Sequence, residues 1–305
     1  MSLALLFPGQ GTQHAGMLAW LDDCPEAAES LGLLAAQLGA DWRSRLDDAQ
    51  WANRNAVAQP LLTGLGLAAW QCVAARLPAP AVIAGYSVGE LPAFCVAGVF
   101  DARVAMSLAR ERAAAMERSA AGHATGLLAV HGIGPSAVAG VCRRHGLAVA
   151  IRLAADRVVL GGLSAALCDA EAGLAAQGIR CTRLAVNVAS HTPWMSAAAT
   201  EVAHWLEPVA FSQPRATLVC NHDGAAERDA AALRLALAGQ IARTVPWDHC
   251  MDAIAERRVR CVLEVGPGSS LARLWSERHP GIPARSVDEF RSAVAVARWV
   301  AATLA

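Results

Sequence analysis

The pentapeptide GYSVG at residues 85–89 constrains the fold of this chain more than any other feature. It lies between the apolar run 82–84, which is typical of a buried strand, and residues 89–97, which have the apolar spacing of a helix. A serine on such a tight strand-to-helix turn has a strained backbone, and flanking glycines let neighbouring elements approach closely. The pattern also arises by chance in structural turns, but this context favours Ser87 as a nucleophile.

Apolar runs and helical spacings alternate along the rest of the chain, which predicts an α/β fold. From residue 124 to 188 the order becomes strand, helix, strand, strand, helix, strand, which is the ferredoxin-like arrangement. We therefore expect a large domain formed by residues 1–123 and 189–305, with residues 124–188 inserted as a small subdomain. The insertion's expected strands are 127–131, 147–153, 158–160 and 183–188, and its expected helices are 135–145 and 164–177. The large domain's expected strands are 3–7, 82–84 and 262–265, and its expected helices are 26–38, 61–76, 89–97, 102–118, 193–206 and 227–243.

Charge and cysteine usage exclude several classes of protein. The chain has 26 basic and 26 acidic residues, whereas a nucleic-acid binder usually has a basic excess. The most apolar stretches, 61–70 and 91–100, are interrupted too early for a membrane span, and the N-terminus has no features of a signal peptide. The nine cysteines are odd in number and lack CxxC spacing, which argues against a disulfide framework and a structural zinc site. We expect free thiols in a cytoplasmic protein, with no nucleic-acid, membrane or metal partner.

A serine nucleophile needs a base, and His191 is the best-placed candidate, because it directly follows a predicted strand. No acidic residue lies beside it in the sequence, so a backbone carbonyl is the expected partner that orients the imidazole in a Ser-His dyad. The amide of Val88 follows the nucleophile and would point toward an oxyanion. Arg112, on a predicted helix, has the fork that grips a carboxylate. As alternatives, His191 is a capping or surface histidine and Arg112 pairs with a glutamate on a solvated helix face.

Four motifs in order resemble the malonyl-CoA:acyl carrier protein transacylases. They are FPGQGTQ at 7–13, GYSVGE at 85–90, SH at 190–191 and EVGPG at 264–268. The resemblance runs from residue 3 to about residue 275. It implies an α/β-hydrolase-like large domain with an inserted ferredoxin-like small subdomain, and an active site between the two.

The resemblance also implies roles for individual residues. Ser87 would attack the thioester and hold the acyl group as an ester, and His191 would act as general base and then general acid. The backbone amides of Gln10 and Val88 would form the oxyanion hole. Arg112 would bind the free carboxylate of malonyl-CoA. The remaining site residues are Gln240, whose carbonyl would orient the histidine, and Gln59, Tyr86 and Trp194 near the pocket.

One departure from the family pattern concerns the residue before the nucleophile, which is usually histidine and here is Tyr86. Together with RSVDEF at residues 285–290, GYSVGE looks most like the epsilon subunit of malonate decarboxylase. That resemblance implies malonyl transfer from malonyl-CoA to a carrier subunit bearing a phosphoribosyl-dephospho-CoA group. In either case the acceptor is a carrier-borne thiol of the phosphopantetheine type, and no permanently bound cofactor is expected.

Three other functions stay open at this stage. The first is malonyl transfer to the acyl carrier protein of fatty-acid or polyketide synthesis. The second is a serine thioesterase or esterase, although such enzymes place an acid between nucleophile and histidine in the chain. The third is a non-catalytic subunit that docks a carrier protein. A basic cluster at Arg257, Arg258 and Arg260 is either a solvated helix end or a contact for an acidic carrier.

Overall fold

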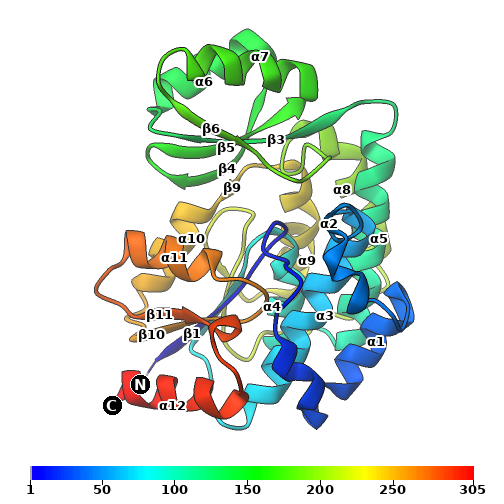
Figure 1. Cartoon of the computed structure of the whole chain (residues 1–305), viewed down its shortest axis with the longest axis vertical. Helices are drawn as coiled ribbons and strands as arrows, with labels where there is room; N and C mark the ends of the chain where they lie inside the picture. Colours follow the sequence, from blue (N-terminus) through cyan, green and yellow to red (C-terminus); the bar gives the residue numbers. More distant parts are fainter. Residues whose placement is uncertain (1) are drawn as a thin grey trace.

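Short strands pair into the central sheet of the large domain, in the order β11-β10-β1-β2-β7-β8, of which Figure 1 labels β11, β10 and β1. The computed structural model describes residues 2–305. The first five strands in that order are parallel and β8 is antiparallel at one edge. Their bounds are β1 Leu3–Phe7, β2 Val82–Gly85, β7 Thr217–Val219, β8 Ala226–Glu227, β10 Cys261–Glu264 and β11 Ala284–Ser286. β1, β2 and β10 are buried along their whole length, as strands in a sheet covered on both faces must be.

Helices cover both faces of this sheet. Figure 1 shows α1, α3 and α5 on one side and α10 and α11 on the other, while α12 runs beneath the sheet near both termini. The helices of the large domain are α1 Ala28–Leu38, α2 Ala49–Ala52, α3 Asn55–Ala74, α4 Glu90–Val96, α5 Ala102–Ala120, α8 Ser196–Leu206, α9 Ala230–Gly239, α10 Trp247–Ala255, α11 Ser270–Arg278 and α12 Ala293–Leu304. Short 3-10 helices are η1 Ala19–Asp23, η2 Pro25–Ala27, η3 Ser44–Asp47, η4 Ser87–Gly89, η5 Pro193–Met195, η6 Gln240–Ala242 and η7 Val287–Glu289.

A second sheet of five strands, in the order β6-β3-β5-β4-β9, forms the small subdomain. Its elements are β3 Thr125–His131, α6 Pro135–His145, β4 Ala148–Ala154, β5 Arg157–Leu163, α7 Ser164–Ala175 and β6 Arg180–Arg183. Figure 1 shows α6 and α7 on the outer face of this sheet, away from the large domain. The predicted fold, an α/β large domain with a small ferredoxin-like subdomain, is therefore confirmed.

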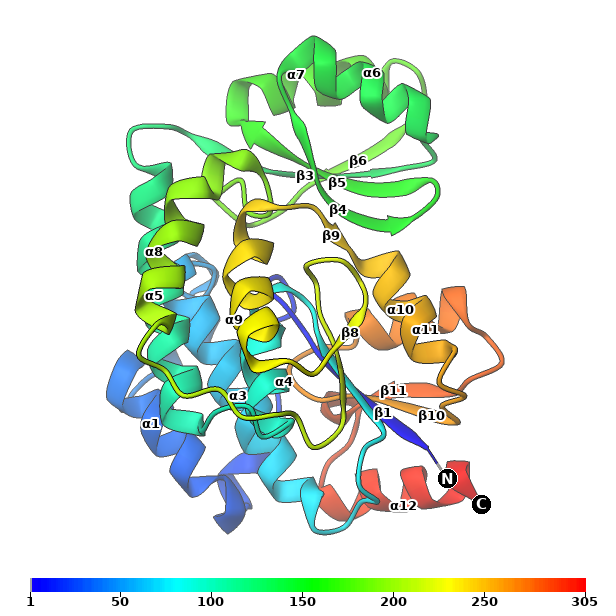
Figure 2. The ribbon, with the colours of Figure 1, turned by 180° about the vertical axis from the view of Figure 1, so that it is seen from behind.

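The small sheet receives its fifth strand from outside the inserted segment. β9, Val245–Pro246, pairs in parallel with β4 and lies between η6 and α10 (Figure 2). A sequence pattern could not reveal this pairing, because two residues carry no periodicity. The boundaries predicted at 124 and 188 stay predictions, but the sheet of the small subdomain extends beyond them.

The expected strand at 183–188 is wrong. β6 ends at Arg183, and residues 184–188 cross from the small sheet toward the large domain. Their alternating apolar side chains resemble a strand pattern, yet Val186 and Val188 belong to the main hydrophobic core, which joins the large domain to the inner face of the small sheet, instead of extending β6. Apolar residues alternate in this segment because one side of it packs against the core as the chain passes between the two domains.

Helix α3 begins at Asn55, six residues before the predicted start, and continues through Pro60. With 20 residues and a mean hydropathy of 1.2 in its most apolar window, it is long and apolar enough to cross a membrane, so the expectation that no stretch reaches that length is wrong. However, 83% of that window is buried inside the protein. Its apolar character is therefore that of a core helix.

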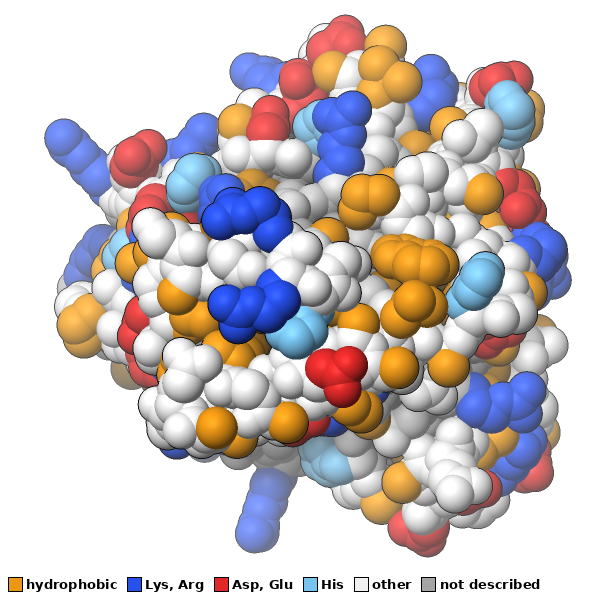
Figure 3. Space-filling model, turned by 90° about the horizontal axis from the view of Figure 1, so that it is seen from above, with side chains coloured by type: hydrophobic (Ala, Val, Ile, Leu, Met, Phe, Trp, Pro, Cys, Tyr) orange, Lys and Arg blue, Asp and Glu red, His pale blue; other side chains and the backbone are white. Residues whose placement is uncertain are grey.

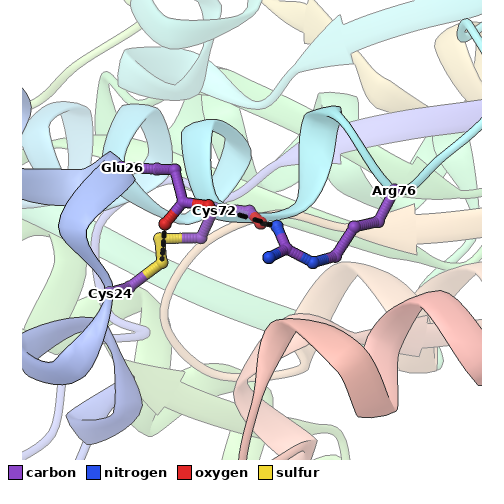
Figure 4. The surroundings of a disulfide bond; sticks show 4 residues. All are labelled: Cys24, Glu26, Cys72 and Arg76. Carbon is purple, nitrogen blue, oxygen red and sulfur yellow. Dashed lines mark hydrogen bonds and ion pairs between the residues drawn. A yellow bond between two sulfur atoms is a disulfide. The ribbon is translucent and has the colours of Figure 1, made fainter.

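Cys24 and Cys72 form a disulfide between the start of η2 and helix α3, and this corrects the expectation of free thiols (Figure 4). Their Cα atoms are 6.3 Å apart, although 48 residues separate them in sequence. The guanidinium of Arg76 lies beside the pair and donates to the carbonyl of Cys72. Spacing in the sequence could not identify this pair, because only the packing of η2 on α3 brings the two residues together.

Glycines allow the strand-to-helix turn at residues 85–89 to pack against β1. A Cβ atom at Gly85 would meet the backbone of Gly89, and a Cβ atom at Gly89 would meet the carbonyl of Phe7. Both obstacles are main-chain atoms, which cannot rotate away as a side chain can. The sequence pattern thus fixes how closely the turn approaches the end of β1.

We expect Gly89→Ala to lower the free energy of unfolding by about 3 kcal/mol, because the added methyl group overpacks a rigid backbone contact. Gly173→Ala is the matched control, since Gly173 lies in α7 and a Cβ atom there would meet nothing within 4 Å. The control should raise the free energy of unfolding by about 0.5–1 kcal/mol. Urea denaturation of both variants checks this, and equal stability of the two would contradict the close approach.

Candidate active site

Ser87 lies at the carboxyl end of β2, on the turn that leads through η4 into α4. Its φ angle is +57°, in the left-handed region that residues other than glycine rarely adopt. This conformation turns the hydroxyl away from the core at the end of a parallel strand. The amide of Val88, buried directly after Ser87, lies at the N-terminal end of the same helical segment, where the helix dipole favours negative charge.

The imidazole of His191, three residues beyond the crossing segment 184–188, reaches Ser87. Its Nε2 lies 2.7 Å from Ser87 Oγ, and its Nδ1 lies 2.7 Å from the carbonyl oxygen of Gln240. A carbonyl only accepts, so Nδ1 carries the proton and Nε2 presents a lone pair to the serine hydroxyl. The backbone N–H of His191 also donates to the carbonyl of Ile241 at 2.8 Å. The expected Ser-His pair thus meets in space, oriented by a main-chain carbonyl.

His191 is neutral at physiological pH. Burial lowers its pKa to about 3, with a smaller contribution from the positive charge of Arg112, and the hydrogen bond to Gln240 opposes both. A neutral imidazole can accept the serine proton, which an imidazolium cannot.

Arg112 is buried against the nucleophile and is not a solvated helix residue. Its Nη1 donates to Gln59 Oε1 at 2.6 Å, and its Nη2 lies 3.3 Å from Ser87 Oγ. Gln59 in turn donates to Asn55 Oδ1 at 2.6 Å, so α3 holds an arginine that α5 supplies. The neighbouring Arg110 pairs with Glu111 at the surface instead.

The positive charge of Arg112 has no ion-pair partner among residues 2–305, and its Nε has no hydrogen-bond partner there. Burial lowers the pKa of Arg112 to about 10, which still leaves the guanidinium charged near neutral pH. A buried cation without a counter-ion is costly. The site is therefore prepared for an anionic group beside Ser87.

The other predicted residues make contacts with residues outside the Ser87–His191–Arg112 centre. Gln10, on the loop after β1, lines a cavity of about 230 Å³ together with Asn55 and Val188, so this cavity lies between the large domain and the crossing segment. Tyr86 packs edge-on against Trp247, with ring centroids 5.1 Å apart. Trp194 packs against His123 and accepts a hydrogen bond from Ser119 at its carbonyl.

Sequence reasoning missed Asn221, which lies two residues beyond the end of β7 and is fully buried. Its Oδ1 accepts from the backbone N–H of Ser87 at 2.7 Å, and its Nδ2 donates to the carbonyl of Gly85 at 2.5 Å. The only signal in the sequence is a polar residue after a short apolar strand, because the turn it contacts lies 134 residues away.

Comparison with known proteins agrees with this geometry. Residues 4–299 match the acyl transferase domain family. The chain is 34% identical to a malonyl CoA-acyl carrier protein transacylase of Mycobacterium tuberculosis, over 93% of this chain and 96% of that protein. It is 32% identical to the protein of that name from Salmonella typhimurium, over 94% and 96%.

Solved structures show the same fold over nearly the whole chain. The acyl-carrier-protein S-malonyltransferase of Burkholderia pseudomallei superposes with a TM-score of 0.90 at 29% identity, covering 98% of this chain and all of the other. A malonyl-transacylase in complex with its type II PKS acyl-carrier protein gives a TM-score of 0.90 at 28% identity, covering 98% and 99%. On its sequence and its structure, this chain belongs to the acyl transferase domain family.

Proposed function

We propose that this protein transfers a malonyl group from malonyl-CoA to the thiol of an acyl carrier protein, through an ester on Ser87. The observation that carries this proposal is the buried guanidinium of Arg112, 3.3 Å from the nucleophile and without a carboxylate partner in residues 2–305. An acyl group with a free carboxylate supplies the missing anion. The related transacylases named above support the same substrate.

The proposed reaction has two matched halves. Ser87 Oγ attacks the thioester carbonyl while His191 Nε2 takes its proton, and the amides of Gln10 and Val88 are proposed to bind the oxyanion. The C–S bond then breaks, and CoA leaves as a thiol with the proton from His191. In the second half a carrier thiol gives its proton to His191, attacks the ester, and releases Ser87 with its proton restored.

The rival hydrolase function receives less support from the site. Its histidine would be oriented by an acid, but here the partner of Nδ1 is the carbonyl of Gln240. His191, the base that would activate an attacking water, is itself only 1% exposed. Transfer to a thiol therefore fits the site better than transfer to water.

The small subdomain is the proposed docking region for the carrier. Residues 124–188 hold six arginines and three acidic residues, a formal charge of +3 in a chain whose net charge is zero. Figure 3 views the molecule from the side of this subdomain and shows several arginine side chains on that face. Arg143, Arg144 and Arg180 are exposed there. A basic surface attracts an acidic carrier and accelerates its association.

The cluster at residues 257–260 is not part of that region. Arg260 donates through its backbone to the carbonyl of Ser2, and Ser2 bonds to the carbonyl of Arg258. These contacts place the cluster at the amino end of β1, whereas Ser87 lies at the carboxyl end of the adjacent parallel strand. This position favours the interpretation of the cluster as a solvated helix end over a contact for an acidic carrier.

The malonate decarboxylase carrier is a second candidate acceptor, which Tyr86 alone supports. The motif at residues 285–290 has a structural role, because Asp288 accepts hydrogen bonds from the amides of Leu18 and Gly268. It therefore does not discriminate between carriers. The relatives described above favour an acyl carrier protein of biosynthesis as the acceptor.

Brief exposure to malonyl-CoA should give a single malonyl adduct by intact-protein mass spectrometry, and Ser87→Ala should abolish it. Arg112→Gln should slow malonylation about 100-fold, because the carboxylate would then enter a buried site without its cation. Arg110→Ala on the same helix is the control and should leave the rate unchanged. Steady release of CoA without an adduct would favour a hydrolase, and neither adduct nor release would favour a docking subunit.

The pH profile should lack a titration at the usual pKa of histidine, which is 6.5. Protonation of His191 removes the base, so the rate falls only as the pH drops through its lowered pKa of about 3. Malonylation of Ser87 should therefore be constant from pH ~5 to ~7.5. The donor should be malonyl-pantetheine, because the ribose 3′-phosphate of CoA itself titrates near pH ~6. A fall centred at the ordinary value would contradict the neutral, buried base.

Carrier preference is tested by offering the isolated malonyl-enzyme two carriers, a biosynthetic acyl carrier protein and a malonate decarboxylase carrier subunit. We expect faster loss of the adduct to the acyl carrier protein. The double variant Arg143→Glu/Arg144→Glu should slow this transfer several-fold at low salt, with the effect shrinking as salt screens the charges. Arg257→Glu is the control at the opposite end of the sheet. Equal slowing by both variants would contradict docking on the small subdomain.

A further inference from the structure

The backbone of Ser87 is held in a conformation that it would not adopt by itself. Ser87 has a φ of +57°, and a positive φ at a residue other than glycine is unfavourable and persists only where the surroundings enforce it. The glycines of the turn permit the close approach to β1, but they do not hold the φ angle of Ser87 at a positive value. Contacts on the side of the turn away from β1 must therefore hold it in place.

Asn221 contacts the turn on both sides of Tyr86. It accepts from the N–H of Ser87 with one end of its side-chain amide and donates to the carbonyl of Gly85 with the other. β2 and β7 are parallel neighbours, and their pairing ends at Ala84 and Val219. The side chain of Asn221 thus continues, past the end of the strands, the hydrogen bonding that the two backbones no longer provide.

Glu90 fixes Asn221 in turn. The backbone N–H of Asn221 donates to Glu90 Oε1 at 2.7 Å, and both residues are almost fully buried. Glu90 is the first residue of α4, three positions after the nucleophile. Gly85, Ser87 and Glu90 therefore all bond to one residue of the neighbouring strand end, so the turn is held before, at and after the nucleophile.

The carboxyl of Glu90 is also compatible with the charge of Arg112. Burial raises the pKa of Glu90 to about 8, and the hydrogen bond from Asn221 and the charge of Arg112 oppose this rise only in part. At neutral pH the group is mostly uncharged. It can therefore accept from Asn221 without neutralising the guanidinium that the substrate carboxylate requires.

We infer that Asn221 is a positioning residue that holds Ser87 in its reactive conformation, and that Glu90 keeps Asn221 in place. Loss of these bonds would let the φ angle of Ser87 relax toward negative values. The hydroxyl would then move away from His191 Nε2, and the amide of Val88 would turn away from the developing oxyanion. This inference rests on the proposed role of Ser87 as the nucleophile, but it does not depend on which acyl donor the protein uses.

Phenylmethylsulfonyl fluoride separates the two questions, because it sulfonylates an activated serine and needs neither a carboxylate clamp nor a carrier. Its rate on the whole protein, followed by intact mass, reports the reactivity of Ser87 alone. Malonylation by malonyl-CoA, with its KM and maximal rate, reports the proposed reaction. Thermal unfolding of each variant reports stability.

Asn221→Ala should slow sulfonylation and malonylation about 100-fold, comparable with the loss of one oxyanion donor, while the KM for malonyl-CoA changes less than about 3-fold. Asn221→Asp keeps the acceptor for the N–H of Ser87 but loses the donor to the carbonyl of Gly85, so we expect an intermediate rate of both reactions. This variant replaces Asn221→Ala as the test if the alanine variant does not fold. Glu90→Ala removes the acceptor for the backbone N–H of Asn221 and should slow both reactions, and Glu90→Gln, which retains an acceptor, should be slowed less. Val296→Ala, a buried site in the remote helix α12, controls for general loss of stability.

Wild-type rates in both Asn221 variants would overturn the inference, as would a loss in Val296→Ala that matches Asn221→Ala at equal melting temperature. A wild-type protein that reacts with the sulfonyl fluoride but not with malonyl-CoA would overturn the proposed function, while slower sulfonylation of Asn221→Ala in that protein would still support the positioning role.

Discussion

The contact between the glycine turn and the end of β1 is the constraint on which the site depends. Because residues 85 and 89 lack Cβ atoms, the turn settles against the carbonyl of Phe7, and the loop that follows β1 lies next to the nucleophile. That contact places Gln10 and Ser87 at the same edge of the sheet. The histidine and the arginine are positioned relative to the turn that this packing brings against β1 and that the hydrogen bonds of Asn221 then hold.

The electrostatics of the site follow from burial more than from charge pairing. The same loss of solvent keeps His191 neutral, keeps Glu90 mostly protonated and leaves Arg112 as a cation without an anion in residues 2–305. Under the proposed function, an anionic acyl group would supply the charge that this neutral base and uncompensated cation lack. Burial thus determines the charge state of His191 and Glu90 and leaves Arg112 without a counter-ion among the described residues.

Much of this arrangement could be predicted from the sequence, because local patterns determine it. The turn, its flanking strand and helix, the ferredoxin-like order and the motif residues all depend on short segments. Three features depend on contacts between distant segments. Asn221 lies 134 residues from Ser87, Cys24 lies 48 residues from Cys72, and β9 is two residues long. The strand predicted at 183–188 failed for a related reason, since alternation does not reveal whether a chain pairs or crosses between domains.

The origin of β9 has a mechanical consequence. The small subdomain is joined to the large domain by its two chain crossings and also by the strand β9, which begins three residues after the end of η6. The side chain of Thr244, just before β9, bonds to the carbonyl of Val149 in β4. The carbonyl of Gln240, which orients His191, therefore lies on the segment 240–246, which is hydrogen-bonded to the small sheet. A rotation of the small sheet would displace the carbonyl that orients the imidazole of His191. The small subdomain and the large domain must therefore move together if His191 is to stay aligned with Ser87.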